Sequence, residues 1–250
     1  MRSSNPVLSA DTFGRRQAAG AAMTIEGTVN KTAASLLILL VTALWTWSLG
    51  SADPLTGHAD PAAAMPWMMV GMVGGFIVAM VTTFKREWSP VTAPAYAALE
   101  GLALGGISVA MNARYPGLVG QAVFLTFGTL GALLVAYRSG WIQVTDRFRL
   151  GIFAATGGIA LFYLVGFILS FFGTGIPLIH GSGPVGIAFS VFVVGIAALN
   201  LVLDFDFIEQ GTRAGAPKYM EWYAAFGLMV TLVWLYIEIL RLLSKLQERR

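Results

Sequence analysis

Seven stretches of mostly apolar residues, separated by short polar breaks rich in Pro and Gly, dominate this sequence. About 20 apolar residues are needed for a helix to cross a bilayer. Because lipid offers no partner to an open backbone group, each stretch is predicted to be a membrane-spanning α-helix. The predicted spans cover residues 33–49, 65–84, 93–111, 118–137, 150–172, 185–203 and 224–243. The pattern therefore predicts an all-α integral membrane protein.

The segments outside the spans are short. Residues 1–31 lack the continuous apolar run of a signal peptide, so we expect a retained cytoplasmic tail. Residues 32–246 form the predicted seven-helix membrane domain, and residues 247–250 form a C-terminal tail. No connection is long enough for a soluble domain.

The distribution of Lys and Arg predicts the orientation. With the N-terminus in the cytoplasm, eleven of the sixteen basic residues fall on the cytoplasmic side, as the positive-inside rule expects. Four of the other five belong to the last segment: Arg241, Lys245, Arg249 and Arg250. We therefore expect a multi-pass protein of the cell membrane with a cytoplasmic N-terminus. The basic residues after the seventh span are the exception to the bias.

Composition excludes several classes of function. Of the residues, 56% are hydrophobic and only 12% are charged, and the net charge of +3 is scattered, unlike the basic patch of a nucleic-acid-binding protein. The chain has no cysteine, and both histidines lie between spans, so we expect neither a thiolate nor a histidine metal site. Without a nucleophile–base pair in the spans, we expect no enzyme; an intramembrane aspartyl protease using Asp204 and Glu238 is the weakest alternative.

Two pairs of glycines recur at helix-packing spacing, Gly71 with Gly75 and Gly101 with Gly105. Small residues four apart let helix backbones approach closely. The pairs indicate tight packing within one chain, or alternatively a dimer interface.

Ionisable residues inside the spans are the main functional candidates. A charged side chain at membrane depth is costly unless it faces the bundle interior, a partner or water. Glu100 lies in the third span, Asp204 and Asp206 close the sixth, and Glu238 lies well inside the seventh. Asn200 is four residues before Asp204, so the two share one helix face.

Each of these acids also has an ordinary structural interpretation. Glu238 could pair with Arg241, three residues later on the same helix. Asp206 could be an interfacial charge, and Glu100 could anchor its helix by a hydrogen bond. In the functional interpretation, Asp204 and Glu238 face each other across the bundle.

Two carboxylates close together in a dry site share a proton and titrate as a unit. When ionised, their oxygens suit a hard cation such as calcium. An acid pair of this kind, such as Asp204 with Glu238, would be a pH-sensitive ion gate that binds calcium transiently, without a resident cofactor. Glu100, Asn200, Asp206 and Arg241 are predicted to support it.

Several segments resemble the Bax inhibitor-one family of membrane proteins. LNLVLDFDFIEQG and APKYMEWYAAFGLMVTLVWLYIEILRLL are similar to its last two helices. SSNPVLS, EWSPVTAPAYAALEGLALGGISVAMNARYPG and GIPLIHGSGPVGIAFS resemble its bacterial branch. The resemblance implies a seven-helix bundle whose last helix is surrounded by the other six.

The resemblance also implies a calcium leak across the membrane, controlled in some members by a pair of acids. Asp204 matches the acid of the sixth helix, and Glu238 matches that of the seventh, which is an aspartate in the member that defines the pair. Asp206 stands where the family often has an amide.

These observations leave two functions open. The first is a pH-sensitive calcium-permeable leak channel or transporter, whose partners are the lipid bilayer and calcium ions. The alternative is a non-transporting modulator or scaffold that binds other membrane proteins, such as a membrane protease. The oligomeric state is not predicted.

Overall fold

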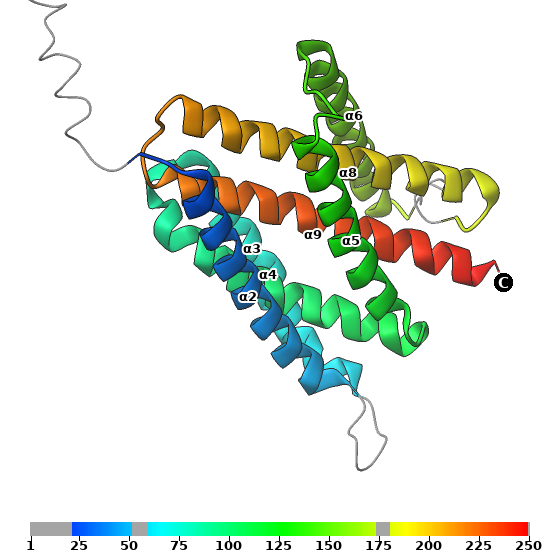
Figure 1. Cartoon of the computed structure of the whole chain (residues 1–250). Helices are drawn as coiled ribbons and strands as arrows, with labels where there is room; N and C mark the ends of the chain where they lie inside the picture. The colour runs from blue at the N-terminus through cyan, green and yellow to red at the C-terminus, as the bar shows by residue number, and fades with distance from the viewer. Residues whose placement is uncertain (1–21, 52–59, 174–180, 250) are drawn as a thin grey trace, which may run out of the picture.

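A computed structural model describes residues 22–51, 60–173 and 181–249. Within these ranges the chain is helical, with no β-strand, and each predicted span coincides with one long helix (Figure 1). The elements are α2 (Ile25–Gly50), α3 (Pro61–Phe84), the short 3-10 helix η2 (Arg86–Trp88), α4 (Ser89–Arg114), α5 (Leu118–Arg138), α6 (Asp146–Ser170), α8 (Pro184–Arg213) and α9 (Met220–Glu248).

Capping residues explain where several helices begin. The Thr24 side chain accepts a hydrogen bond from the Gly27 amide, so α2 begins at Ile25, within the segment predicted as a tail. Asp60 caps α3 through the Ala62 amide, and Thr145 caps α6. The helices therefore extend beyond the purely apolar stretches that predicted them.

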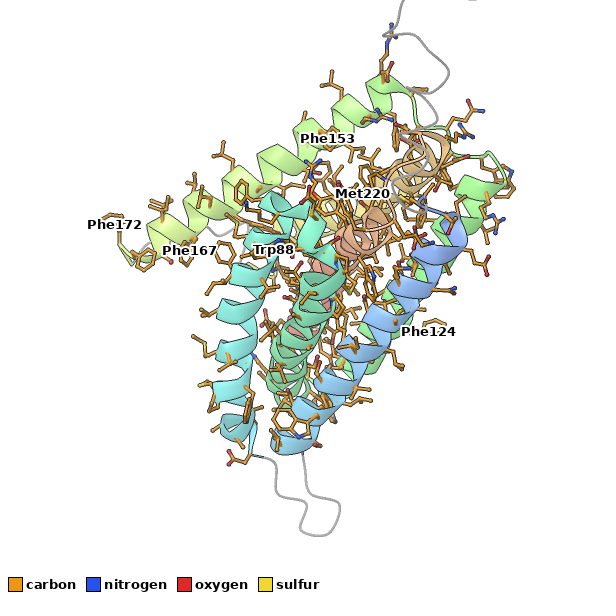
Figure 2. All side chains as sticks on the ribbon, turned by 90° about the vertical axis from the view of Figure 1, so that its left-hand side faces the viewer. Trp88, Phe124, Phe153, Phe167, Phe172 and Met220 are labelled. Carbon is orange, nitrogen blue, oxygen red and sulfur yellow. The ribbon has the colours of Figure 1, made fainter. Side chains whose placement is uncertain are left out.

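The outer surface of the helices is strongly apolar. All seven long helices in the described ranges are long and apolar enough to span a membrane. Figure 2 shows Phe153, Phe167 and Phe172 along and just beyond α6, and each is more than half exposed. Exposed apolar side chains on this scale would be unfavourable in water but are suited to lipid. The chain is therefore a multi-pass membrane protein.

Helix α9 lies at the centre of the fold. In its most apolar stretch 56% of residues are buried inside the protein, against 11% for α6. It runs beside α8 (Figure 1) and also packs on α2, α4 and α5. Helix α3 packs mainly on α4, and α6 packs on α8. The last helix is thus central, as predicted, with α3 and α6 in an outer layer.

The two glycine pairs lie at contacts within the chain. A Cβ atom at Gly71 would collide with the α4 backbone at Leu99 and Ala103, and one at Gly75 would press on Glu100. Gly101 and Gly105 face the α2 backbone equally closely. These glycines let α4 pack tightly between α2 and α3, which is the intramolecular alternative.

Candidate functional site

Glu238 is buried in an ion pair. Its side chain is only 1% exposed, and both carboxylate oxygens accept hydrogen bonds from Arg241 Nη1, at 2.8 and 2.9 Å. Arg241 also donates to the Tyr163 hydroxyl of α6 at 2.6 Å, and that hydroxyl donates to Glu238 Oε2 at 3.1 Å. The guanidinium stacks 4.9 Å from the centre of the Tyr163 ring. This triad, Glu238–Arg241–Tyr163, ties α9 to α6 and neutralises the acid.

Asp204 has a different environment. It lies on α8, and its carboxyl faces the Thr231 side chain of α9. Its Oδ2 atom is buried without a hydrogen-bond partner. Within the described residues Asp204 forms no ion pair. A buried carboxyl oxygen without a partner is costly, so this position is the least compensated acid in the α8–α9 contact.

The structure does not join the two predicted sensor acids by a hydrogen bond. Thr231, opposite Asp204, precedes Glu238 by seven residues, which is about 10 Å along a helix axis. The two acids therefore lie at different depths along the same helix contact. One is paired with a cation, and the other is not.

The neighbours of Asp204 on α8 have polar partners of their own. Asn200 donates to the Thr156 hydroxyl of α6 at 2.9 Å and to its own helix backbone. Asp206 accepts from Arg149 at 2.6 Å and from Gln210 at 2.7 Å. Asp206 therefore forms an ion pair between α8 and α6, its ordinary interpretation.

Glu100 belongs to the α3–α4 contact. Its carboxyl has the Tyr96 hydroxyl, one turn earlier on α4, as a hydrogen-bond partner. Gly75 of α3 leaves room for one of its oxygens. The Tyr96–Glu100 hydrogen bond therefore lies within α4 and does not itself join α4 to another helix.

Sequence reasoning missed a second buried acid, Glu221, in the first turn of α9. It is 0% exposed and accepts hydrogen bonds from Lys31 at 2.5 Å, Lys218 at 2.7 Å, and both the amide and the hydroxyl of Thr24 at 2.9 Å. Gly27 packs directly on the carboxyl, where a side chain would collide with it. This Glu221 cluster fastens the start of α2 to the start of α9.

The other end of α9 is also held by charged side chains. Lys245 is 3% exposed and donates to the Ser190 hydroxyl at 2.9 Å and to the Gly186 carbonyl at 3.1 Å, both on α8. Glu248 pairs with Arg114 at 3.2 Å and accepts from the Tyr115 hydroxyl. The residues after the apolar core of α9 are therefore bound into the fold and do not form a loose tail up to Glu248.

The described residues contain no group of three or more acids or histidines that could hold a metal ion. Calcium takes six to eight oxygen ligands, so neither Asp204 nor Glu238 alone forms a high-affinity site. Asp204, which has an unpartnered oxygen, can offer a cation a single carboxylate contact.

Comparison with protein families gives one result. The family model described as Bax inhibitor 1 like matches residues 5–248, nearly the whole chain. No curated protein and no solved structure matches it. With its seven spanning helices, its central last helix and this match, the chain belongs to the Bax inhibitor 1 like family.

Proposed function

We propose that this protein is a pH-sensitive leak for cations, calcium included, and that the cations pass along the contact between α8 and α9. In this proposal Asp204 is the group that binds a proton or contacts the passing cation. The protein would lie in the cell membrane with the start of α2 at the cytoplasmic face. The resemblance described above implies the same activity.

The unpartnered oxygen of Asp204 is the observation that carries the proposal. A buried carboxylate without a cation is unfavourable, so either a proton or a metal cation would stabilise it. The two ligands would compete for one carboxyl, and a leak that depends on the ionised form would change with pH.

The Glu238–Arg241–Tyr163 triad is assigned a different role. Because Glu238 is already neutralised by Arg241, it has less need of a proton or a cation. We assign the triad to holding α9 against α6 in the closed arrangement. Breaking it would let this part of α9 move relative to α6, while Lys245 still holds the end of α9 to α8.

Calcium flux into liposomes that hold the purified protein tests the proposal, over about pH 6 to 8. Asp204→Asn removes the titrating group, so its flux should lose the pH dependence of the wild type. Glu238→Gln weakens the triad, so its flux should rise while remaining pH-dependent. Glu26→Gln is the control, because Glu26 is exposed at the start of α2, away from the α8–α9 contact, and should leave both properties unchanged.

Flux no greater than in empty liposomes, from folded protein, would reject the leak. A wild-type pH profile in Asp204→Asn would reject the assignment of Asp204. An increase in Glu26→Gln equal to that in Glu238→Gln would reject the role of the triad.

A non-transporting partner of membrane proteins is the second candidate, and one observation favours it. Gly157 and Gly158 of α6 face open space, where an added Cβ would meet nothing. Small residues on a lipid-facing helix are suited to close packing with another helix. A specific complex that co-purifies, together with absent flux, would favour this function.

A further inference from the structure

A long groove separates α2 from α5 along most of their length. It consists of two adjoining cavities, of about 370 and 720 Å³, that share Leu36 of α2 as a lining residue. The smaller cavity reaches Trp47 of α2, and the larger reaches Ile25 at its start. The groove floor is formed by α9, through side chains such as Leu228 and Leu232.

The polarity of the groove changes with depth. Arg138 and Gln143 line the end near the start of α2. Thr32 lines the same cavity, and its hydroxyl oxygen is buried without a hydrogen-bond partner. Beyond Thr32 the walls are apolar, with Leu36 on α2 and Leu130 on α5. The groove therefore passes from a cationic mouth, through one free hydroxyl, to a hydrocarbon-like interior.

The charge at the mouth is positive. Two acids line this cavity, but Asp206 is paired with Arg149 and Glu209 with Arg213. Arg138 forms no ion pair with any residue that the structure describes. An unpaired guanidinium at a membrane–water boundary is suited to a phosphate group, which it can bind through two hydrogen bonds.

We propose that the α2–α5 groove binds one anionic phospholipid from the leaflet at the start of α2. The phosphate contacts Arg138, the ester linkage accepts a hydrogen bond from Thr32, and one acyl chain lies along the apolar walls. From Thr32 to Trp47 the groove extends about 22 Å along α2. One leaflet of hydrocarbon is about 15 Å deep, so a full acyl chain fits.

The order of chemical groups favours a lipid over a soluble anion. A soluble phosphate would use only Arg138 and would leave the apolar part of the groove uncovered. A phospholipid contacts Arg138, Thr32 and the apolar walls, and its acyl chain would fill the space between α2 and α5 against α9. Lipid binding does not depend on cation flux, so it can be tested independently of the proposed leak.

Native mass spectrometry of the full-length protein from bilayers of phosphatidylcholine and phosphatidylglycerol, in a three-to-one ratio, tests the site. The wild type should retain one phosphatidylglycerol in preference to phosphatidylcholine. Arg138→Gln should lower that preference roughly tenfold, as expected for loss of a charged hydrogen bond. Arg147→Gln is the matched control, because Arg147 is exposed at the start of α6 and does not line the groove.

A blocking variant tests the acyl part of the site. Ala33, next to Thr32, lines the larger cavity and is exposed, so Ala33→Phe should fill the groove at the depth of the acyl chain. It should abolish retention of the lipid. Ala34→Phe, also exposed on α2 but outside the groove lining, should retain it.

Three results would overturn the proposal. These are equal retention of the two lipids by the wild type, the same preference in Arg138→Gln as in Arg147→Gln, and unchanged binding in Ala33→Phe. Millimolar inorganic phosphate should leave the lipid in place, and displacement by phosphate alone would indicate a soluble-anion site instead.

Discussion

The Glu238–Arg241 ion pair gives the sharpest test of how the protein tolerates charge at membrane depth. Replacing either partner alone strands the other charge in the bundle, whereas replacing both strands none. A double-mutant cycle of Glu238→Leu, Arg241→Leu and the combined variant measures this coupling. The two single variants should differ because the partners are buried to different extents.

The size of each effect follows from the exposure of the charge left behind. Arg241→Leu leaves Glu238, only 1% exposed, without its cation, and breaking a buried pair in this way costs about 3–5 kcal/mol. Glu238→Leu leaves Arg241, which is 31% exposed and can extend toward the interface, so about 2 kcal/mol is expected. The double variant should lie within about 1–2 kcal/mol of the wild type, because apolar replacements of a buried pair are often tolerated.

Thermal unfolding in detergent, followed by tryptophan fluorescence at one fixed scan rate, measures the cycle. For a chain of this size about 1 kcal/mol corresponds to 2–4 °C in Tm, so Arg241→Leu should lower Tm by about 6–20 °C. The double variant should recover most of that loss. If the two single losses simply add in the double variant, the carboxylate and the guanidinium do not stabilise each other.

Three further predictions follow from other contacts. Glu221→Gln should lower Tm by several degrees, because Lys31 loses its buried partner, whereas Glu26→Gln on the exposed face of α2 should have little effect. Gly101→Ala should destabilise the protein by about 1–3 kcal/mol, since its Cβ collides with the α2 backbone. Gly128→Ala, in open space, should be neutral or slightly stabilising, and thermal unfolding measures both. With a cytoplasmic N-terminus, the connection between α3 and α4 should also be cytoplasmic. Because the chain has no cysteine, Glu87→Cys places a single thiol there, and a membrane-impermeant thiol reagent added to intact cells should label it only after the membrane is permeabilised.

Hydropathy was sufficient to find the seven helices, because burial in lipid requires long apolar stretches whatever the helices pack against. Hydropathy misplaced the ends of helices where a charged residue is buried against a polar or charged partner. Glu221 and Lys245 both lie beyond the predicted edges of the last span, yet both are buried. A hydropathy pattern treats such residues as solvated, since it contains no information on the lysines or hydroxyls that compensate them.

The sequence identifies the acids at membrane depth, and the number of residues between each acid and the α8–α9 connection indicates how deep each one lies. Helices α8 and α9 are joined by a short connection and run antiparallel. Asp204 lies about nine residues before the end of α8, roughly 14 Å from the connection, while Glu238 lies about 27 Å beyond it. The same distance, measured from the start of α9, reaches the region of Thr231, so Asp204 lies opposite Thr231 and not opposite Glu238. The partner on α6, Tyr163, has no comparable signal, since an aromatic residue in an apolar span is ordinary.

The charges of α9 also explain the exception to the positive-inside bias. Glu238, Arg241, Lys245 and Glu248 follow one another at spacings of three or four residues, which places them along one face of a helix. Tyr163 and Ser190 provide partners for this face within the fold, and Glu248 at its end pairs with Arg114 at the surface. Arg241 and Lys245 therefore act as internal cations of the bundle and not as charges of a loop. The positive-inside rule concerns short loops near the span ends, so these two residues should be left out of the orientation count, which strengthens the prediction of a cytoplasmic N-terminus.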